Sequence, residues 1–198
     1  MRHPRIHLFL LALGLSAVTT FAADDSKQVY LAVAGEYFAQ KPEVMADFAE
    51  RYGARDDLAV TLFLATRARR PVEEVHQLRM RGLFWWEIAF MNDVPGDVWF
   101  PEYEGEPGPP YGRAYEKLSG WRHGSIDKLD VSDDEVRHLV AVRMLHEYFR
   151  IPIEQAMDLR KSGRDLPTIL ESEVRKRSRG DAVPHDRSAG NGSPTSGR

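Results

Sequence analysis

The sequence predicts an all-α fold in which two related helical hairpin units pack together, joined by an irregular, aromatic connection rich in Pro and Gly. Apolar residues recur at steps of three and four over 29–90 and again over 133–177, as on the buried face of a helix. Residues 71–88 reappear in outline 81 positions later, at 152–169. Between these copies, residues 93–125 contain five Pro, six Gly and six aromatic side chains.

Residues 1–22 have the pattern of a cleaved signal peptide. Arg2 and Arg5 give a basic start, an apolar run of 11 residues follows from Leu8 to Val18, and Thr20-Phe21-Ala22 forms a small-x-small cleavage site. This predicts a periplasmic or secreted protein. The alternative is an uncleaved anchor, although the uncharged run is shorter than the ~20 residues of a spanning helix.

Composition narrows the classes of partner. The chain carries a net charge of −3, and removing residues 1–22 lowers it to −5 because they hold two Arg and no acid. Nucleic acids and anionic membranes are negative, so neither is an expected partner. The chain has no Cys, which excludes disulfides, thiol chemistry and a lipid-anchored lipoprotein. No stretch after the signal segment is apolar enough to span a membrane.

The first unit, residues 27–92, is predicted to be a series of short helices. Pro42 and Pro71 suit first helical turns, and Gly53 suits a helix end. Asp56 or Asp57 is expected to cap the third helix. The expected helices cover about 29–38, 42–52, 57–69, 71–81 and 84–91.

The second unit, residues 131–178, begins with a capping box. Ser132 suits the N-cap and Glu135 stands three residues later, ahead of an apolar stripe that reaches Phe149. Pro152 begins the next predicted helix, and a last helix runs from 166 to about 177. The tail, residues 179–198, is rich in Gly, Ser and Pro and is predicted to be disordered.

The two copies match at positions that control a helical turn. Six of 18 aligned residues are identical between 71–88 and 152–169. Pro fixes the first helical turn, and Gly82 and Gly163 suit the left-handed conformation that reverses the chain. A single such unit cannot bury its apolar face alone, so the two are expected to pack together.

The run at 71–88 and the Gly-Pro-Pro-Tyr-Gly sequence at 108–112 resemble segments of a family of bacterial exported helical proteins of uncharacterised activity. The resemblance covers roughly residues 40–175 and implies an α-helical fold and an envelope location. It carries over no functional residues. The second copy lacks counterparts of Trp85 and Trp86, so a ligand of those rings would not bind both copies alike.

A helix-turn-helix is a weaker interpretation of 70–88. Its recognition helix would be 84–91, which offers no Arg, Lys, Asn or Gln to read base edges. Export and negative charge also oppose DNA binding. A packed helical hairpin with Trp in the core explains the same residues.

No catalytic, cofactor or metal constellation is evident. His76, His123, His138 and His146 lack the spacing of a known metal site, and Glu102, Glu104 and Glu106 read as a solvated acidic loop. Nucleophile and phosphate-binding motifs are missing too. We therefore expect no cofactor and no metal. An envelope enzyme of unrecognised type, using His123 or loop carboxylates, is kept as an alternative.

The connection, residues 93–130, is the candidate partner-binding surface. Pro and aromatic residues together form stiff, apolar patches that suit protein or glycan partners. The opposing and favoured interpretation is that these rings fold back over the helices as a lid. The favoured function is a non-enzymatic interaction or structural module that contacts another envelope protein or a cell-wall component. The candidate residues are Trp99, Tyr103, Tyr111, Tyr115 and Trp121.

Overall fold

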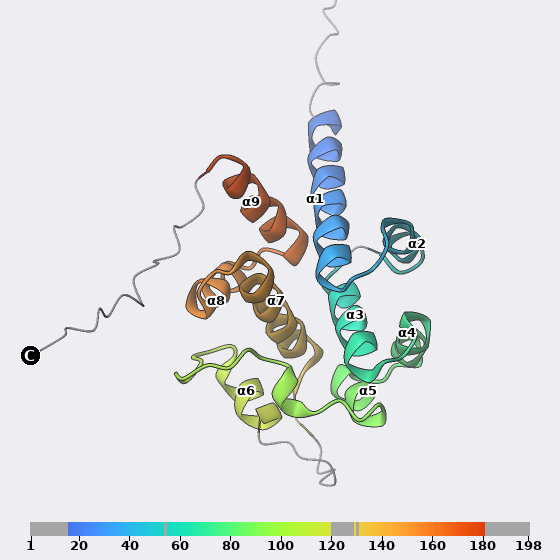
Figure 1. The fold of residues 1–198 in the computed structure, drawn as a ribbon, viewed down its shortest axis with the longest axis vertical. Helices are drawn as coiled ribbons and strands as arrows, with labels where there is room; N and C mark the ends of the chain where they lie inside the picture. The colour runs from blue at the N-terminus through green and yellow to red at the C-terminus, as the bar shows by residue number, and fades with distance from the viewer. Residues whose placement is uncertain (1–15, 54, 120–128, 130, 181–198) are drawn as a thin grey trace, which may run out of the picture.

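The computed structural model describes residues 16–53, 55–119, 129 and 131–180. This part of the chain is all-helical, which confirms the predicted fold class, and it contains no strand. The helices are α1 (Ser16–Tyr37), α2 (Pro42–Tyr52), α3 (Asp56–Ala68), α4 (Val72–Met80), α5 (Trp85–Met91), the 3-10 helix η1 (Gly96–Val98), α6 (Gly112–Ser119), α7 (Asp133–Phe149), α8 (Ile153–Lys161) and α9 (Leu166–Ser178) (Figure 1).

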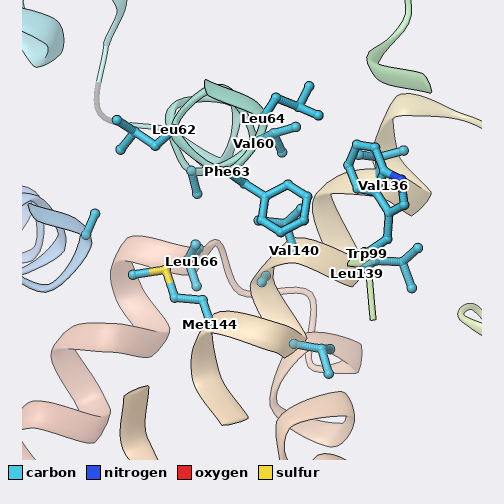
Figure 2. Close-up of a cluster of buried hydrophobic side chains, with 14 of the residues drawn as sticks. Val60, Leu62, Phe63, Leu64, Trp99, Val136, Leu139, Val140, Met144 and Leu166 are labelled. Carbon is cyan, nitrogen blue, oxygen red and sulfur yellow. The ribbon is translucent and has the colours of Figure 1, made fainter. Parts of the chain in front are cut away.

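Helices α3 and α7 form the centre of the core. Every residue of α3 from Leu58 to Ala65 is buried, because neighbouring helices cover the helix on all sides. Phe63 of α3 points toward α7, where Val140 lies close by, and Trp99 packs beside them (Figure 2). α4 and α5 lie on one side of the α3–α7 pair, and α8 and α9 lie on the other (Figure 1).

Helix α1 begins earlier than the sequence pattern predicts, at Ser16 rather than near Val29. It packs against α9, which runs at an angle to it (Figure 1). The Tyr30 hydroxyl donates to the Arg55 carbonyl at 2.7 Å, and the Ser26 hydroxyl donates to Glu171 of α9. These contacts come from residues that follow the predicted cleavage site. No helix in the described ranges combines the length and the apolar character that crossing a membrane requires.

The segments 71–88 and 152–169 follow the same backbone path. Pro71 and Pro152 precede α4 and α8 with φ/ψ of −55°/141° and −54°/147°, and both helices have nine residues. Gly82 and Gly163 then take φ of 87° and 76°, the left-handed region in which a Cβ atom is unfavourable. The equivalent glycines therefore make equivalent turns.

The helix starts differ from the predictions in one instructive respect. The capping box of α7 is confirmed: Ser132 Oγ accepts from the Glu135 N–H at 3.2 Å, and Glu135 accepts from the Ser132 N–H at 2.7 Å. The predicted cap of α3 by Asp56 or Asp57 is wrong, because Arg55 is the N-cap residue and makes no side-chain cap. Asp56 instead accepts from the N–H of Leu166, at the start of α9.

The connection 93–130 is more regular than predicted. It contains η1 and α6, and the residues between them turn back against α7 and α8. Arg143 of α7 donates to the carbonyls of Val98 and Phe100, which holds this segment to the core. Residues 181–198 of the predicted tail lie outside the described part of the chain.

Candidate functional site

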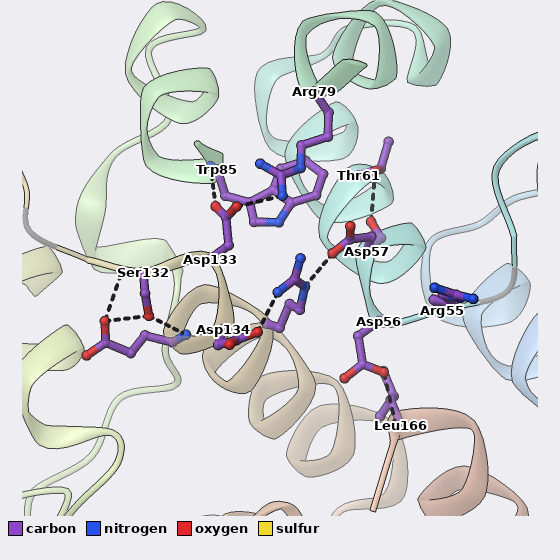
Figure 3. Close-up of polar contacts among 12 residues, drawn as sticks. Arg55, Asp56, Asp57, Thr61, Arg79, Trp85, Ser132, Asp133, Asp134 and Leu166 are labelled. Atoms are coloured by element: carbon purple, nitrogen blue, oxygen red, sulfur yellow. Dashed lines mark hydrogen bonds and ion pairs between the residues drawn. The ribbon is translucent and has the colours of Figure 1, made fainter. Parts of the chain in front are cut away.

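Asp133, the first residue of α7, joins α4 to the start of α5. One carboxylate oxygen lies 2.6 Å from Nη2 of Arg79, and the other accepts from the Trp85 N–H at 3.0 Å (Figure 3). Arg79 also donates through Nη1 to the Leu83 carbonyl at 2.8 Å. The carboxylate therefore fixes the α4–α5 turn through a charged partner and a backbone donor, and it satisfies an amide that the helix start leaves unpaired.

The same arrangement occurs in the second unit. Arg160, 81 residues after Arg79, donates to Asp56 Oδ2 at 2.7 Å and to the Arg164 carbonyl at 3.1 Å. The other oxygen of Asp56 accepts from the Leu166 N–H at 3.1 Å. Each arginine thus pairs with the first residue of the other unit's central helix. Through these pairs the start of α7 lies against the turn that contains Gly82, and the start of α3 lies against the turn that contains Gly163.

A cavity of about 490 Å³ opens beside this anchor, and we call it the Trp85 cavity. Its walls come from the end of α2, the start of α3, the α4–α5 turn and Asp133. Trp85 lies fully buried at its edge, with the Arg79 guanidinium 4.7 Å from the centre of its ring. The volume falls within the range of about 300–1,000 Å³ that is usual for ligand pockets.

The rim of the Trp85 cavity is apolar and open to solvent. Met80 is 73% exposed and Phe84 is 50% exposed, and both line the cavity. Phe84 is the N-cap residue of α5, a position that favours Ser, Thr, Asp or Asn because its side chain can accept from the first helical N–H groups. The Phe84 backbone N–H donates to Glu87 at 2.8 Å, so half of a capping box is present.

Polar groups on the cavity walls are already engaged with one another. Asp57 pairs with Arg137 of α7, and the Thr61 hydroxyl donates to the Asp57 carbonyl. The His76 ring lies against Tyr52, with ring centres 3.5 Å apart, and burial lowers the pKa of His76 below its ordinary value. The Thr61 hydroxyl is thus hydrogen-bonded to the backbone of its own helix.

The aromatic residues predicted as a partner surface mostly serve the interior. Trp99 and Tyr111 are fully buried, while Tyr103 and Tyr115 are half-buried around Phe100. This is the arrangement that the lid interpretation describes. Trp121 lies outside the described residues. The Tyr111 hydroxyl donates to the Met157 carbonyl at 2.9 Å, and burial raises the pKa of Tyr111 to about 12.

Those of the polar candidates that lie within the described residues are not gathered at one place. His138 and His146 lie on α7, but within the described ranges no group of three His or acidic side chains could hold a metal ion. Glu102, Glu104 and Glu106 are exposed, as expected of a solvated loop. His123, which carried the enzyme alternative, lies outside the described residues.

Sequence reasoning missed the Trp85 cavity, although one signal was available. When the two copies are aligned, Phe84 stands opposite Asp165, and Met80 stands opposite Lys161. Asp165 is a working N-cap that accepts from the Thr168 N–H at 3.0 Å. An apolar residue where the sister copy has a cap is a local conflict, and such conflicts concentrate at functional sites.

Comparisons of this chain with models of protein families, with curated proteins and with solved structures found no match.

Proposed function

We propose that this protein is an exported, non-enzymatic binding module of the cell envelope, and that the Trp85 cavity is where it contacts a protein partner. The observation that carries the proposal is Phe84, a half-exposed aromatic side chain at a helix N-cap on the rim of a cavity. An apolar residue at an N-cap costs about 1 kcal/mol against Ser or Asp. A contact made by the ring is a reason for keeping it there.

The chemistry of the cavity supports a binding role. Met80 and Phe84 present apolar surface, and Arg79 and Asp133 hold the wall behind them in place. Such a site has a rigid base and an apolar rim, the features that concentrate binding energy at protein interfaces.

We further infer that the two units, 27–92 and 131–178, are copies of one helical element. Sequence matches, equal turn dihedrals and the exchanged Arg–Asp pairs support this. Only the first copy carries the exposed Met80 and Phe84, so the copies would have divided their roles, with the second serving stability and the first serving contact.

Export rests on the signal pattern at 1–22, and the packing of α1 is compatible with cleavage there. The described contacts of α1 begin with Ser26 and Tyr30, so a chain starting at Ala23 keeps them. We expect the periplasmic or secreted fraction to contain protein whose N-terminal residue is Ala23, measured by intact mass and N-terminal sequencing. A full-length chain that stays in the membrane fraction would contradict cleavage.

The binding role is tested by photo-crosslinking in cells. A photoreactive residue at Phe84 should give one discrete protein adduct, and adding Met80→Ser to the same chain should remove it. The matched control is a photoreactive residue at Met91, which is 57% exposed but does not line the cavity. Equal adducts at both positions, or none at Phe84, would contradict the proposal.

A further inference from the structure

The second unit contains an occupant where the first unit has the Trp85 cavity. Tyr111, from the connection, is buried against the second unit, and its hydroxyl donates to the Met157 carbonyl at 2.9 Å. Its ring meets His138 edge to face, with ring centres 5.9 Å apart. The positive charge of Arg160 lies close enough to offset part of the rise in the pKa of Tyr111 that burial causes.

The residues around Tyr111 are counterparts of residues that line the cavity. Counting back 81 positions, Met157 corresponds to His76, Arg160 to Arg79 and His138 to Asp57. In the second unit the Tyr111 ring lies in this corner, where its hydroxyl reaches the Met157 carbonyl of α8 and its ring meets His138 of α7. In the first unit the same corner stays open even though Tyr52 packs on His76 from one side.

We propose that the Trp85 cavity binds a Tyr or Phe side chain presented by an extended, proline-containing segment of a partner protein, as Tyr111 is presented to the second unit. This inference rests on the proposed function and names the partner's chemistry. Tyr111 follows Pro109 and Pro110, whose rings restrict the backbone and so reduce the entropy lost when the segment is held in place.

The rim of the cavity fits such a guest. Phe84 can pack edge to face on an incoming ring, and the Met80 thioether makes favourable contacts with aromatic edges. The second unit has Asp165 and Lys161 at these positions, where Tyr111 is supplied from within the chain and no partner needs to be recruited. The two units therefore differ at both rim positions. Apolar residues stand beside the open cavity of the first unit, and charged residues stand at the equivalent positions of the second unit, where Tyr111 is bound.

The chain itself supplies the probe. An acetylated peptide of residues 105–113, with the sequence Gly-Glu-Pro-Gly-Pro-Pro-Tyr-Gly-Arg, is titrated into the isotope-labelled protein and followed by NMR. We expect saturable shifts of the Trp85 indole N–H and of the Gly82 amide, with no shift at Gly163. The same peptide carrying Tyr111→Ala should cause no shift, and Tyr111→Phe should retain binding.

The protein variant that tests the rim is Met80→Ser with Phe84→Ser. Both side chains are exposed, and Phe84→Ser completes a capping box with Glu87, so the fold is retained. The double variant should bind the peptide at least tenfold more weakly, and Met91→Ser should bind it unchanged. The inference would be overturned by any of three results. The Tyr111→Ala peptide could bind as tightly as the parent peptide, the peptide could shift Gly163 by displacing the resident Tyr111, or the parent peptide could fail to bind.

The two proposals fail separately. An adduct at Phe84 that depends on Met80, together with no peptide binding, leaves the binding module standing and removes the aromatic guest. If neither the Phe84 adduct nor binding of the peptide is observed, both proposals are contradicted.

Discussion

Asp133 lies 2.6 Å from Arg79 across a sequence gap that spans the whole connection, and Asp56 meets Arg160 at 2.7 Å in the mirrored arrangement. Each unit therefore neutralises the arginine of the other. Because each carboxylate also accepts a backbone N–H at the start of the other unit's last helix, the pairs tie together the two halves of the core.

Asp56→Ala should strongly destabilise the protein. Arg160 is only 5% exposed, so removing its acid leaves a buried charge without its acidic partner and also leaves the Leu166 N–H unpaired. We expect a loss of about 3 kcal/mol in the free energy of unfolding, measured by urea denaturation. The matched control is Asp134→Ala, because Asp134 is 81% exposed and its pair with Arg137 should contribute less than about 1 kcal/mol. Equal losses of unfolding free energy for the two variants would contradict the conclusion that the Asp56–Arg160 pair ties the two units together.

Phe84→Ser should stabilise the protein while removing its proposed contact. Ser at this N-cap would accept from the Glu87 N–H, as Ser132 does from Glu135 in α7. We expect the free energy of unfolding to rise by about 1 kcal/mol, seen as a higher urea midpoint. Met91→Ser, at an exposed position near the end of α5, should change it by less than about 0.5 kcal/mol. A stability loss on Phe84→Ser would show that the ring serves the fold.

Stability should fall as the solution becomes mildly acidic, partly through His138. Burial, aided by the charge of Arg160, lowers the pKa of His138 in the folded protein below its ordinary value. The unfolded chain then binds a proton that the folded chain does not, so the stability is full above about pH 6.5 and declines as the pH drops toward the folded pKa. Urea midpoints across this window should decline less in His138→Gln than in the parent protein. An identical decline in both would exclude His138.

Gly163→Ala should test the backbone of the second turn alone. Gly163 has φ of 76°, and a Cβ atom placed there would meet nothing within 4 Å. The cost is therefore conformational, about 1 kcal/mol in the free energy of unfolding. Thermal or urea unfolding measures it, and Ser162→Ala is the neighbouring control in an ordinary helical conformation. No loss on Gly163→Ala would mean that the turn can adopt another path.

Local signals predicted the helices and their turns. The Ser132–Glu135 box, the Gly53 helix end and the breaks at Gly82 and Gly163 all depend on groups a few residues apart. The early start of α1 and the short helix α6 were not predicted. Tyr111, Ala114, Tyr115 and Leu118 do have helical spacing, but the Pro and Gly residues around them led to the prediction of an irregular connection. The first residues of α1 belong to the segment that was predicted to be a signal peptide.

The candidate site could not be predicted in the same way. Asp56 carries the mark of a local cap, yet its partners Arg160 and Leu166 are more than 100 positions away. Aromatic residues in a Pro-rich connection suit either a surface or a lid. Only packing decides that Trp99 and Tyr111 belong to the core while Phe84 faces solvent.

By itself the sequence determined the all-helical class of the described residues and the positions of their turns, because those follow from spacing and backbone preference within a few residues. It also contains the match of six residues in 18 between 71–88 and 152–169. The tertiary structure decided which acid neutralises which arginine, which rings are covered and where a cavity stays open. Those outcomes depend on the surfaces that distant segments bring together, and no local pattern encodes them.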